Sequence, residues 1–462
     1  MYQLYPDQER TLNLLRRKMG QGKRKVLLQA ATGSGKTILA TSLIQAADAK
    51  GKKTLFVLPR KELLKQTHQT YNNCGVIHGI IASGHKANGI HDHYIAMDKT
   101  LVRRLEDTRP PDVAFIDETH YGGQTIGNII EWLDNNGSYI VGLTATPWLL
   151  SGKGLGCWYD DMVCGPGMRW LINNNRLSDY KLFTADVSRP GVKKTGGDYN
   201  AAALEKALFE DKARIGNAVK TYNQHCAGLR TVVFGVSIKD CERIADEFNT
   251  SGINAAVISG ETPETERKNL IMQFAKGKLV LTNCELLTFG FDLAAQVGFD
   301  VTVEAMIDMA PTLSLAKQMQ KWGRVLRIKE NPAIICDHAG NVFEHDKPCA
   351  EREWTLEDRP KHGKGGEKSK ETTITLRQCL ACGYTFKPAP SCPKCGELVP
   401  VKERQIDEVD GTLVEVNIET FKKRQRQEVG KAESMDELWR IAKERGYASG
   451  WVFRQAKLKE LV

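Results

Sequence analysis

Short, almost wholly apolar segments recur along this chain, separated by longer stretches with the apolar spacing of helices. Strands that are apolar on both faces are typical of parallel sheets covered by helices on each side. The segments form two series, at 26–30, 54–59, 113–117 and 139–143, and then at 231–237, 255–260, 279–284, 305–310 and 333–339. This alternation predicts an α/β fold with two doubly wound parallel-sheet domains in tandem.

Changes in composition along the 462 residues predict the domain boundaries. With 41% hydrophobic residues the chain can bury a core in each domain, which excludes a wholly disordered protein. Gly- and Lys-rich stretches, at 188–200 and 359–373, are typical of loops and linkers. We predict α/β domains at 1–180 and 229–345, a linker with a helix at 181–228, a flexible linker at 346–378, a cysteine module at 379–400 and a helical C-terminal segment at 401–462.

The sequence AATGSGKT (30–37) directly follows the first predicted strand and opens the first long helix. A phosphate can be approached this closely only by a glycine-rich backbone, whose N–H groups join the helix N-terminus in binding the anion. Lys36 would supply a charge to the β- and γ-phosphates, and the Thr37 hydroxyl would bind Mg²⁺. The predicted phosphate-site residues are Thr32, Gly33, Ser34, Gly35, Lys36 and Thr37.

Asp117 and Glu118 stand together at the carboxyl end of a strand that is expected to be buried. Two adjacent carboxylates are costly there unless they take part in the chemistry. Asp117 is predicted to hold Mg²⁺ and Glu118 to orient and deprotonate an attacking water. An exposed acidic turn is the alternative, and the phosphate loop upstream favours the catalytic interpretation.

Two C-x-x-C pairs lie close together near the C-terminus, and a glycine follows each of them. Without a secretory signal, this spacing favours a metal over disulfides. Four thiolates close the tetrahedral shell of Zn²⁺, so the site is predicted to be a structural zinc ribbon that folds with its metal. The predicted ligands are Cys379, Cys382, Cys392 and Cys395. Contact with DNA and docking of a protein both remain open as the role of this module.

Lys and Arg number 65 against 56 for Asp and Glu, a formal net charge of +9. This excess fits a polyanionic partner but also an ordinary basic soluble protein. The basic run 421–426 is likewise either a solvated helix face or a DNA backbone contact, and Trp439 and Trp451 are expected in the core of a small helical cap.

No apolar run is long enough to cross a membrane, and the N-terminus lacks a signal pattern. We therefore expect no membrane partner and a cytoplasmic location. That location would be the bacterial cytosol or nucleoid, or the host cytoplasm if the protein is phage-encoded.

The motifs occur in the order and spacing of the superfamily two helicases, the DEAD/DEAH (DExH) group, over residues 1–345. Within that group the chain resembles the RadD-type bacterial and phage-encoded DNA helicases. The closest matches are GLTATPW (142–148), GFD (290–292), QKWGRVLR (320–327) and DHAGN (337–341). The resemblance implies two RecA-like domains that bind ATP between them.

The resemblance also implies roles for residues outside the phosphate loop. Gln8 matches the glutamine that reads adenine, with Tyr5 as the stacking ring. His120 matches the histidine that couples the nucleotide site to the second domain. Gly290 and Asp292 match motif V and are expected at the nucleotide.

Gln320, Arg324 and Arg327 match motif VI. The transition state of γ-phosphate transfer spreads negative charge over three oxygens, which a guanidinium from the other domain can stabilise. We expect Arg327 to be this arginine finger and Arg324 a second phosphate contact. ATP binding and hydrolysis would then close and open the two domains.

Hydroxyl, amide and loop N–H groups at strand ends bind nucleic-acid phosphates without reading bases. Thr144 and Thr146 match motif III, which links hydrolysis to DNA contacts. By resemblance and position, the predicted nucleic-acid contacts are Pro59, Arg60, Thr100, Thr144, Thr146, Phe234, Ser237, Thr282 and Asn283.

Together these features predict an ATP-dependent DNA helicase or translocase that needs ATP, Mg²⁺ and Zn²⁺. The expected substrate is single-stranded, forked or branched DNA in replication, recombination or repair, including branch migration. A replication or recombination protein could dock on the zinc ribbon or the tail. An RNA helicase, and an ATP-switched nucleic-acid-binding scaffold that separates no strands, remain as alternatives. The sequence offers no recognisable wedge for strand separation.

Overall fold

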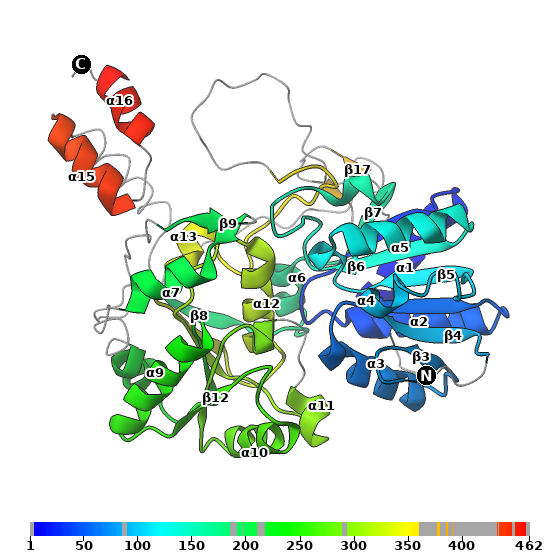
Figure 1. The fold of residues 1–462 in the computed structure, drawn as a ribbon, viewed down its shortest axis with the longest axis horizontal. Coiled ribbons are helices and arrows are strands. Elements are labelled where there is room, and N and C mark those ends of the chain that lie inside the picture. The colour runs from blue at the N-terminus through cyan, green and yellow to red at the C-terminus, as the bar shows by residue number, and fades with distance from the viewer. Residues whose placement is uncertain are drawn as a thin grey trace. The chain divides into compact units, whose positions relative to one another are not determined.

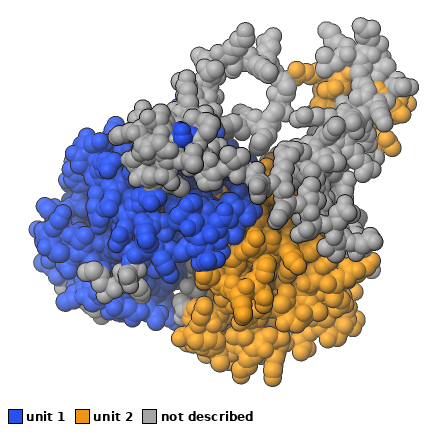
Figure 2. Space-filling model, turned by 180° about the vertical axis from the view of Figure 1, so that it is seen from behind, with its two compact units in different colours: residues 1–177, 290–292, 349–405 blue, residues 178–289, 293–348, 406–462 orange. Residues whose placement is uncertain are grey.

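A computed structural model provides the fold. It describes residues 4–85, 90–184, 192–195, 197–209, 218–288, 293–359, 377–378, 385–386, 391, 432, 434–445 and 449–458. Gly290, Asp292, the four paired cysteines and the basic run 421–426 therefore lie outside the described residues. The chain divides into two compact units, coloured separately in Figure 2. Unit 1 contains 1–177, 290–292 and 349–405, and unit 2 contains 178–289, 293–348 and 406–462.

Unit 1 contains a seven-stranded sheet in the order β3-β4-β2-β5-β6-β1-β7, and every strand pair is parallel (Figure 1). The strands are β1 Lys25–Gln29, β2 Thr54–Leu58, β3 Gly79–Ile81, β4 His93–Met97, β5 Val113–Ile116, β6 Tyr139–Thr144 and β7 Asp161–Cys164. The helices are α1 Pro6–Gly20, α2 Lys36–Asp48, α3 Lys61–Asn73, α4 Asp98–Leu101, η1 Thr119–Tyr121, α5 Gln124–Asn135, η2 Leu155–Cys157 and α6 Met168–Asn173. The four strands predicted for this region are confirmed.

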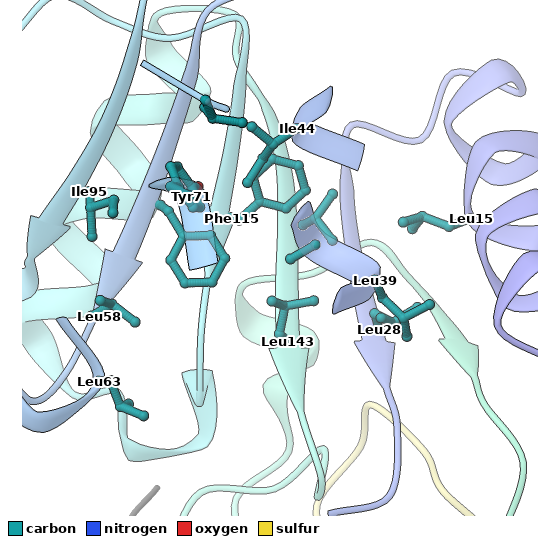
Figure 3. Close-up of a cluster of buried hydrophobic side chains, with 14 of the residues drawn as sticks. Leu15, Leu28, Leu39, Ile44, Leu58, Leu63, Tyr71, Ile95, Phe115 and Leu143 are labelled. Atoms are coloured by element: carbon teal, nitrogen blue, oxygen red, sulfur yellow. The ribbon is translucent and has the colours of Figure 1, made fainter. Parts of the chain in front are cut away.

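Two separate apolar clusters cover the two faces of this sheet. Neighbouring residues of one strand point to opposite faces, so Leu28 and Phe115 join one cluster while Leu27 and Ala114 join the other. The first cluster also receives side chains from α1, α2 and α3, several of which are labelled in Figure 3. The second receives the apolar face of α5. Burial on both faces explains why the central strands are apolar throughout.

Unit 2 contains a six-stranded parallel sheet in the order β12-β13-β11-β14-β15-β8. Its strands are β8 Tyr180–Thr184, β11 Thr231–Phe234, β12 Ala255–Ile258, β13 Val280–Asn283, β14 Ala305–Asp308 and β15 Ala333–Asp337. The helices are α7 Ala201–Phe209, η3 Tyr222–Cys226, α9 Ile238–Thr250, α10 Glu264–Ala275, η4 Leu286–Thr288, α11 Leu293–Val297, α12 Leu315–Val325 and α13 Asn341–His345. A two-stranded ribbon pairs β9 Lys194–Thr195 with β10 Asp198–Tyr199. The five strands predicted here are confirmed.

The predicted linker at 181–228 is wrong at its start, because β8 is the edge strand of the second sheet and pairs with β15. As an edge strand β8 is only partly buried, so its sequence YKLFT lacks the continuous apolar run of the central strands.

The predicted flexible linker at 346–378 also differs, since its first part packs on unit 1. Trp354 lies against Trp148 with ring centroids 5.1 Å apart, and the Trp148 indole donates to the Glu357 carbonyl at 2.8 Å. The Gly154 N–H donates to the Asp358 carboxylate at 2.9 Å. Apolar side chains on this segment therefore anchor it beside the end of motif III.

Within the predicted helical C-terminal segment at 401–462, the described residues form a hairpin of α15 Met435–Arg445 and α16 Ser449–Leu458 (Figure 1), and 401–431 lies outside the described residues. Leu438, Ile441, Ala442, Val452 and Ala456 form its core. Trp451 packs against this core as expected, but the prediction for Trp439 is wrong because that side chain is exposed.

Upstream, β16 Arg377–Gln378 pairs antiparallel with β17 Thr385–Phe386. Among the described residues, no helix has the length and apolar character that crossing a membrane requires.

Candidate active site

The phosphate loop joins β1 to α2 and contains two glycines with left-handed backbones, Gly33 at φ 85° and Gly35 at φ 89°. A side chain at Gly35 would be strained, and its Cβ would lie 2.7 Å from Nε2 of Gln8. Glycine is therefore required at this position by both backbone conformation and space. The loop leads directly into the first turn of α2, where Lys36 and Thr37 lie.

Gln8 connects the first turn of α1 to this loop. Its Nε2 donates to the Ser34 carbonyl at 3.0 Å, and its Oε1 accepts from the Tyr5 N–H at 3.1 Å. The structure thus brings Tyr5 and Gln8 to the phosphate loop, as the resemblance implies. Adenine recognition by these two residues stays a prediction.

Arg176 is a neighbour of this group that carries no motif and was missed by the sequence analysis. Its guanidinium carbon lies 3.1 Å from the centroid of the Tyr5 ring, and its Nη1 is 2.9 Å from the Asp7 carboxylate. Arg176 therefore holds the Tyr5 ring from one side. It lies near the end of unit 1, far from Tyr5 in the chain, so no local pattern could have identified it.

Asp117 and Glu118 follow β5 and are almost completely buried. Burial and the neighbouring Glu118 raise the pKa of Asp117 to about 7, while the charge of Lys36 opposes this shift. A divalent cation beside Asp117 would relieve the unfavourable charge. The Thr37 hydroxyl and the Asp117 carboxylate are hard oxygen donors that suit Mg²⁺.

Among the described residues, no group of three or more His, Cys, Asp or Glu side chains could hold a metal.

His120 connects Glu118 to motif III. Its Nδ1 lies 3.3 Å from the Glu118 carboxylate and 2.9 Å from the Thr144 hydroxyl. The Thr144 hydroxyl already donates to the Thr146 carbonyl at 2.6 Å, so Nδ1 of His120 must be the donor. Burial lowers the pKa of His120 to about 4, which keeps the ring neutral at physiological pH. His120 thus contacts the predicted catalytic base on one side and is hydrogen-bonded to Thr144, at the end of β6, on the other.

Glu118 itself has a left-handed backbone, with φ 45°. This conformation is uncommon for a residue with a side chain and is typical of positions where strain serves a site. The arrangement can orient a carboxylate precisely and can transmit its displacement to Thr144.

The predicted nucleic-acid contacts divide by burial. Pro59 and Arg60 follow β2, and Arg60 directly precedes α3. Thr100 lies within α4. The side chains of Thr144 and Thr146 are buried, and the Thr144 hydroxyl bonds to His120 and to the carbonyl and N–H of Thr146. The link of these two residues to DNA stays a prediction.

In unit 2 the side chains of Phe234, Thr282 and Asn283 are buried, and contact of these residues with nucleic acid stays a prediction. Thr282 donates to the Cys241 carbonyl, and the Asn283 side chain accepts from the Leu287 N–H. These residues secure strand ends. Ser237 caps α9 by accepting from the Asp240 N–H at 3.1 Å, so its hydroxyl also has a structural partner.

Motif VI occupies α12 and the residues after it. Gln320 and Arg324 are buried, and Nε of Arg324 donates to the Leu287 carbonyl at 2.8 Å. Arg327 lies just beyond the helix and is half-buried; its carbonyl accepts from the Ser178 hydroxyl. The roles of these three residues at ATP stay predictions.

A buried carboxylate that the sequence analysis missed holds α12 in place. Asp308, at the end of β14, is fully buried and lies 2.7 Å from Nζ of Lys321. It also accepts from the amides of Gln318 and Asn341, each at 3.0 Å. The available signal was an acidic residue ending an apolar strand, the same signal that identified Asp117.

Comparison with known proteins agrees with this architecture. The family model described as "Type III restriction enzyme, res subunit" matches residues 1–149, and "Helicase conserved C-terminal domain" matches 217–329. A 51.5 kDa protein of Lactococcus phage (isolate 7-9) is 30% identical over 387 residues, which are 82% of this chain and 79% of the relative.

A protein of Schizosaccharomyces pombe named as mitochondrial ATP-dependent helicase irc3 is 28% identical over 374 residues, 75% of this chain and 59% of the relative. The solved structure of the ATP-dependent Type ISP restriction-modification enzyme LlaBIII bound to DNA has a TM-score of 0.52 at 15% identity. It covers 72% of this chain, which spans only 27% of that enzyme, and it shows similarity of fold alone. With the two domain matches, the phage relative and the two parallel-sheet units, the chain belongs to the superfamily two DExH-type helicases and is an ATP-hydrolysing helicase.

Proposed function

We propose that this helicase acts on DNA and unwinds or remodels forked or branched structures in replication, recombination or repair. The observation that carries the proposal is the contact series Glu118–His120–Thr144, in which His120 lies 3.3 Å from the Glu118 carboxylate and is hydrogen-bonded to Thr144, because it connects the predicted catalytic base to motif III. Hydrolysis can thereby be coupled to movement along a strand. The choice of DNA is supported by the restriction-modification enzyme of similar fold, whose structure is described as bound to DNA.

The residues divide the chemistry as follows. Lys36 binds the β- and γ-phosphates, and Thr37 and Asp117 bind Mg²⁺, which supplies positive charge to the phosphates. Glu118 orients and deprotonates the attacking water. Arg327 stabilises the charge of the transition state, with Gln320 and Arg324 as further motif VI contacts.

Steady-state ATP hydrolysis with different nucleic acids tests the choice of substrate. We expect single-stranded, forked or four-way-junction DNA to raise the rate by about tenfold or more, with little effect of RNA. The stimulation should fall steeply with salt, because phosphate contacts release counterions. Lys36→Ala, which removes the phosphate-binding charge, serves as the inactive control.

Stimulation by RNA alone would instead identify an RNA helicase. A rate indifferent to every nucleic acid would favour the ATP-switched scaffold that separates no strands.

We also infer a structural Zn²⁺ held by Cys379, Cys382, Cys392 and Cys395. Support comes from the C-x-x-C spacing and from the antiparallel pair β16–β17, which brackets the first cysteine pair. A pair of short strands on either side of two cysteines is compatible with a zinc ribbon, in which a metal-binding turn joins the strands.

Cys392→Ser is expected to abolish zinc binding while basal ATP hydrolysis stays within about twofold, since none of the residues assigned to the phosphate site belongs to the cysteine module. Elemental analysis of freshly purified protein measures the metal. Cys157→Ser is the matched control, because Cys157 is an exposed free thiol. Wild-type protein that contains no zinc would refute the inference.

A further inference from the structure

Two large aromatic side chains lie outside the core of the C-terminal hairpin. The core uses Leu438 and Ile441 of α15 and Val452 of α16. Trp439 and Phe453 follow core positions by one residue, so they point about 100° away from them around each helix. Trp439 is 41% exposed and Phe453 54% exposed. This small module therefore presents apolar rings that its own packing does not need.

The two rings hold each other in a defined geometry. Their centroids are 6.0 Å apart and their planes meet at 88°, which is an edge-to-face pair. Each ring limits the rotation of the other, although they come from different helices. Half-exposed rings fixed in this way can accept a third ring at small entropic cost.

A basic residue accompanies each aromatic one. Arg440 directly follows Trp439 and Arg454 directly follows Phe453, and both arginines are exposed. Guanidinium groups bind phosphates, whereas aromatic faces stack on bases. A strand of nucleic acid with unpaired bases supplies both chemistries at adjacent positions, with bases for the rings and phosphates for the arginines.

We propose that Trp439 and Phe453 form a stacking platform for unpaired bases of single-stranded DNA, with Arg440 and Arg454 binding the adjoining phosphates. The proposal rests on the DNA function proposed above and adds a base-holding element to it. By retaining bases after they separate, the platform would help to keep the two strands apart. The helicase motifs provide no residue for this task.

Binding of a labelled oligodeoxythymidine strand to the full-length protein tests the platform by fluorescence anisotropy. Trp439→Ala and Phe453→Ala are each expected to weaken binding about 5- to 100-fold, the loss of one stacked base. Trp439→Phe, which keeps a ring, should stay within about threefold of wild type. Tyr139→Ala is the matched control, because Tyr139 is an exposed aromatic residue at the start of β6. Basal ATP hydrolysis should be unchanged in all four variants.

A strand with abasic positions separates stacking from other effects. Wild-type protein should bind the abasic strand more weakly than the normal strand. The factor should be about the same as the one by which the alanine substitutions weaken binding to the normal strand. The alanine variants should bind the two strands equally. Arg440→Gln and Arg454→Gln should each reduce the slope of log affinity against log salt by about 1.

The platform is refuted if wild-type protein binds the strand and the alanine variants match it. It is also refuted if the variants weaken binding to normal and abasic strands alike, since the lost contact would then not be stacking. Wild-type protein that neither binds DNA nor responds to it would refute the proposed DNA function as well, which distinguishes the two failures.

Discussion

Replacing Glu118 by glutamine is expected to slow ATP hydrolysis by about 10²- to 10⁴-fold, the usual contribution of a positioned general base. The amide keeps the size of the side chain and its place beside His120, but it cannot take a proton from water. ATP binding should change little, because the phosphate loop and Lys36 are untouched. Turnover at saturating ATP measures the first effect, and equilibrium binding of a fluorescent ATP analogue measures the second.

The matched control is Glu106→Gln, which makes the same chemical change at an exposed position of unit 1. It should hydrolyse ATP at the wild-type rate. If Glu118→Gln also keeps a near-normal rate, the catalytic base lies elsewhere and the site described here is wrong. A large rise in KM with unchanged kcat would assign Glu118 to binding rather than to chemistry.

The second large effect concerns stability. Asp308→Ala is expected to lower the free energy of unfolding of unit 2 by about 3–5 kcal/mol, because it leaves the buried ammonium of Lys321 without its counter-charge. The amides of Gln318 and Asn341 lose their acceptor as well. Since Gln318 and Lys321 belong to α12, the same change should displace motif VI and reduce ATP turnover. Urea unfolding followed by circular dichroism gives the shift in midpoint.

Removal of both charges of the Asp308–Lys321 pair tests whether the unpaired Lys321 ammonium causes the loss of stability. The double variant Asp308→Leu, Lys321→Met should recover much of the lost stability, because apolar residues of similar volume replace a buried ion pair at little cost. Lys268→Ala is the surface control. Its pair with Glu264 is 3.8 Å long with both side chains exposed, so the expected loss is below about 0.5 kcal/mol. Equal losses for Asp308→Ala and Lys268→Ala would contradict the role given to the buried pair.

Structural features whose signal lies within one short stretch of chain could be predicted from the sequence. Every strand predicted from a continuous apolar run is present, since central parallel strands are buried on both faces. Of the strands that escaped prediction, β3 and β8 lie at sheet edges, where one side can be polar, whereas β4 lies inside its sheet between β3 and β2. Edge strands need fewer apolar residues, and their sequences therefore resemble loops.

The predicted nucleic-acid contacts stay predictions, and a strand-end motif does not reveal which of their side chains turn inward. Thr144, Thr282 and Asn283 satisfy backbone groups inside their domains. Trp439 shows the opposite difference, because it was predicted to be buried and is exposed. Apolar side chains usually pack inward, but its neighbour Leu438 takes the core position on α15 and leaves the ring outside.

Local order along the chain was enough to predict two parallel α/β domains, the phosphate loop and the acidic strand end, because each depends on neighbouring residues and on glycine backbones. Contacts between distant residues came from folding in three dimensions: Gln8 on the phosphate loop, Arg176 on Tyr5, His120 on Thr144 and Lys321 on Asp308. Strand order places the ends of β5, β6 and β1 next to one another, and only then do their side chains meet. Such contacts depend on register and side-chain direction, which a one-dimensional pattern does not contain.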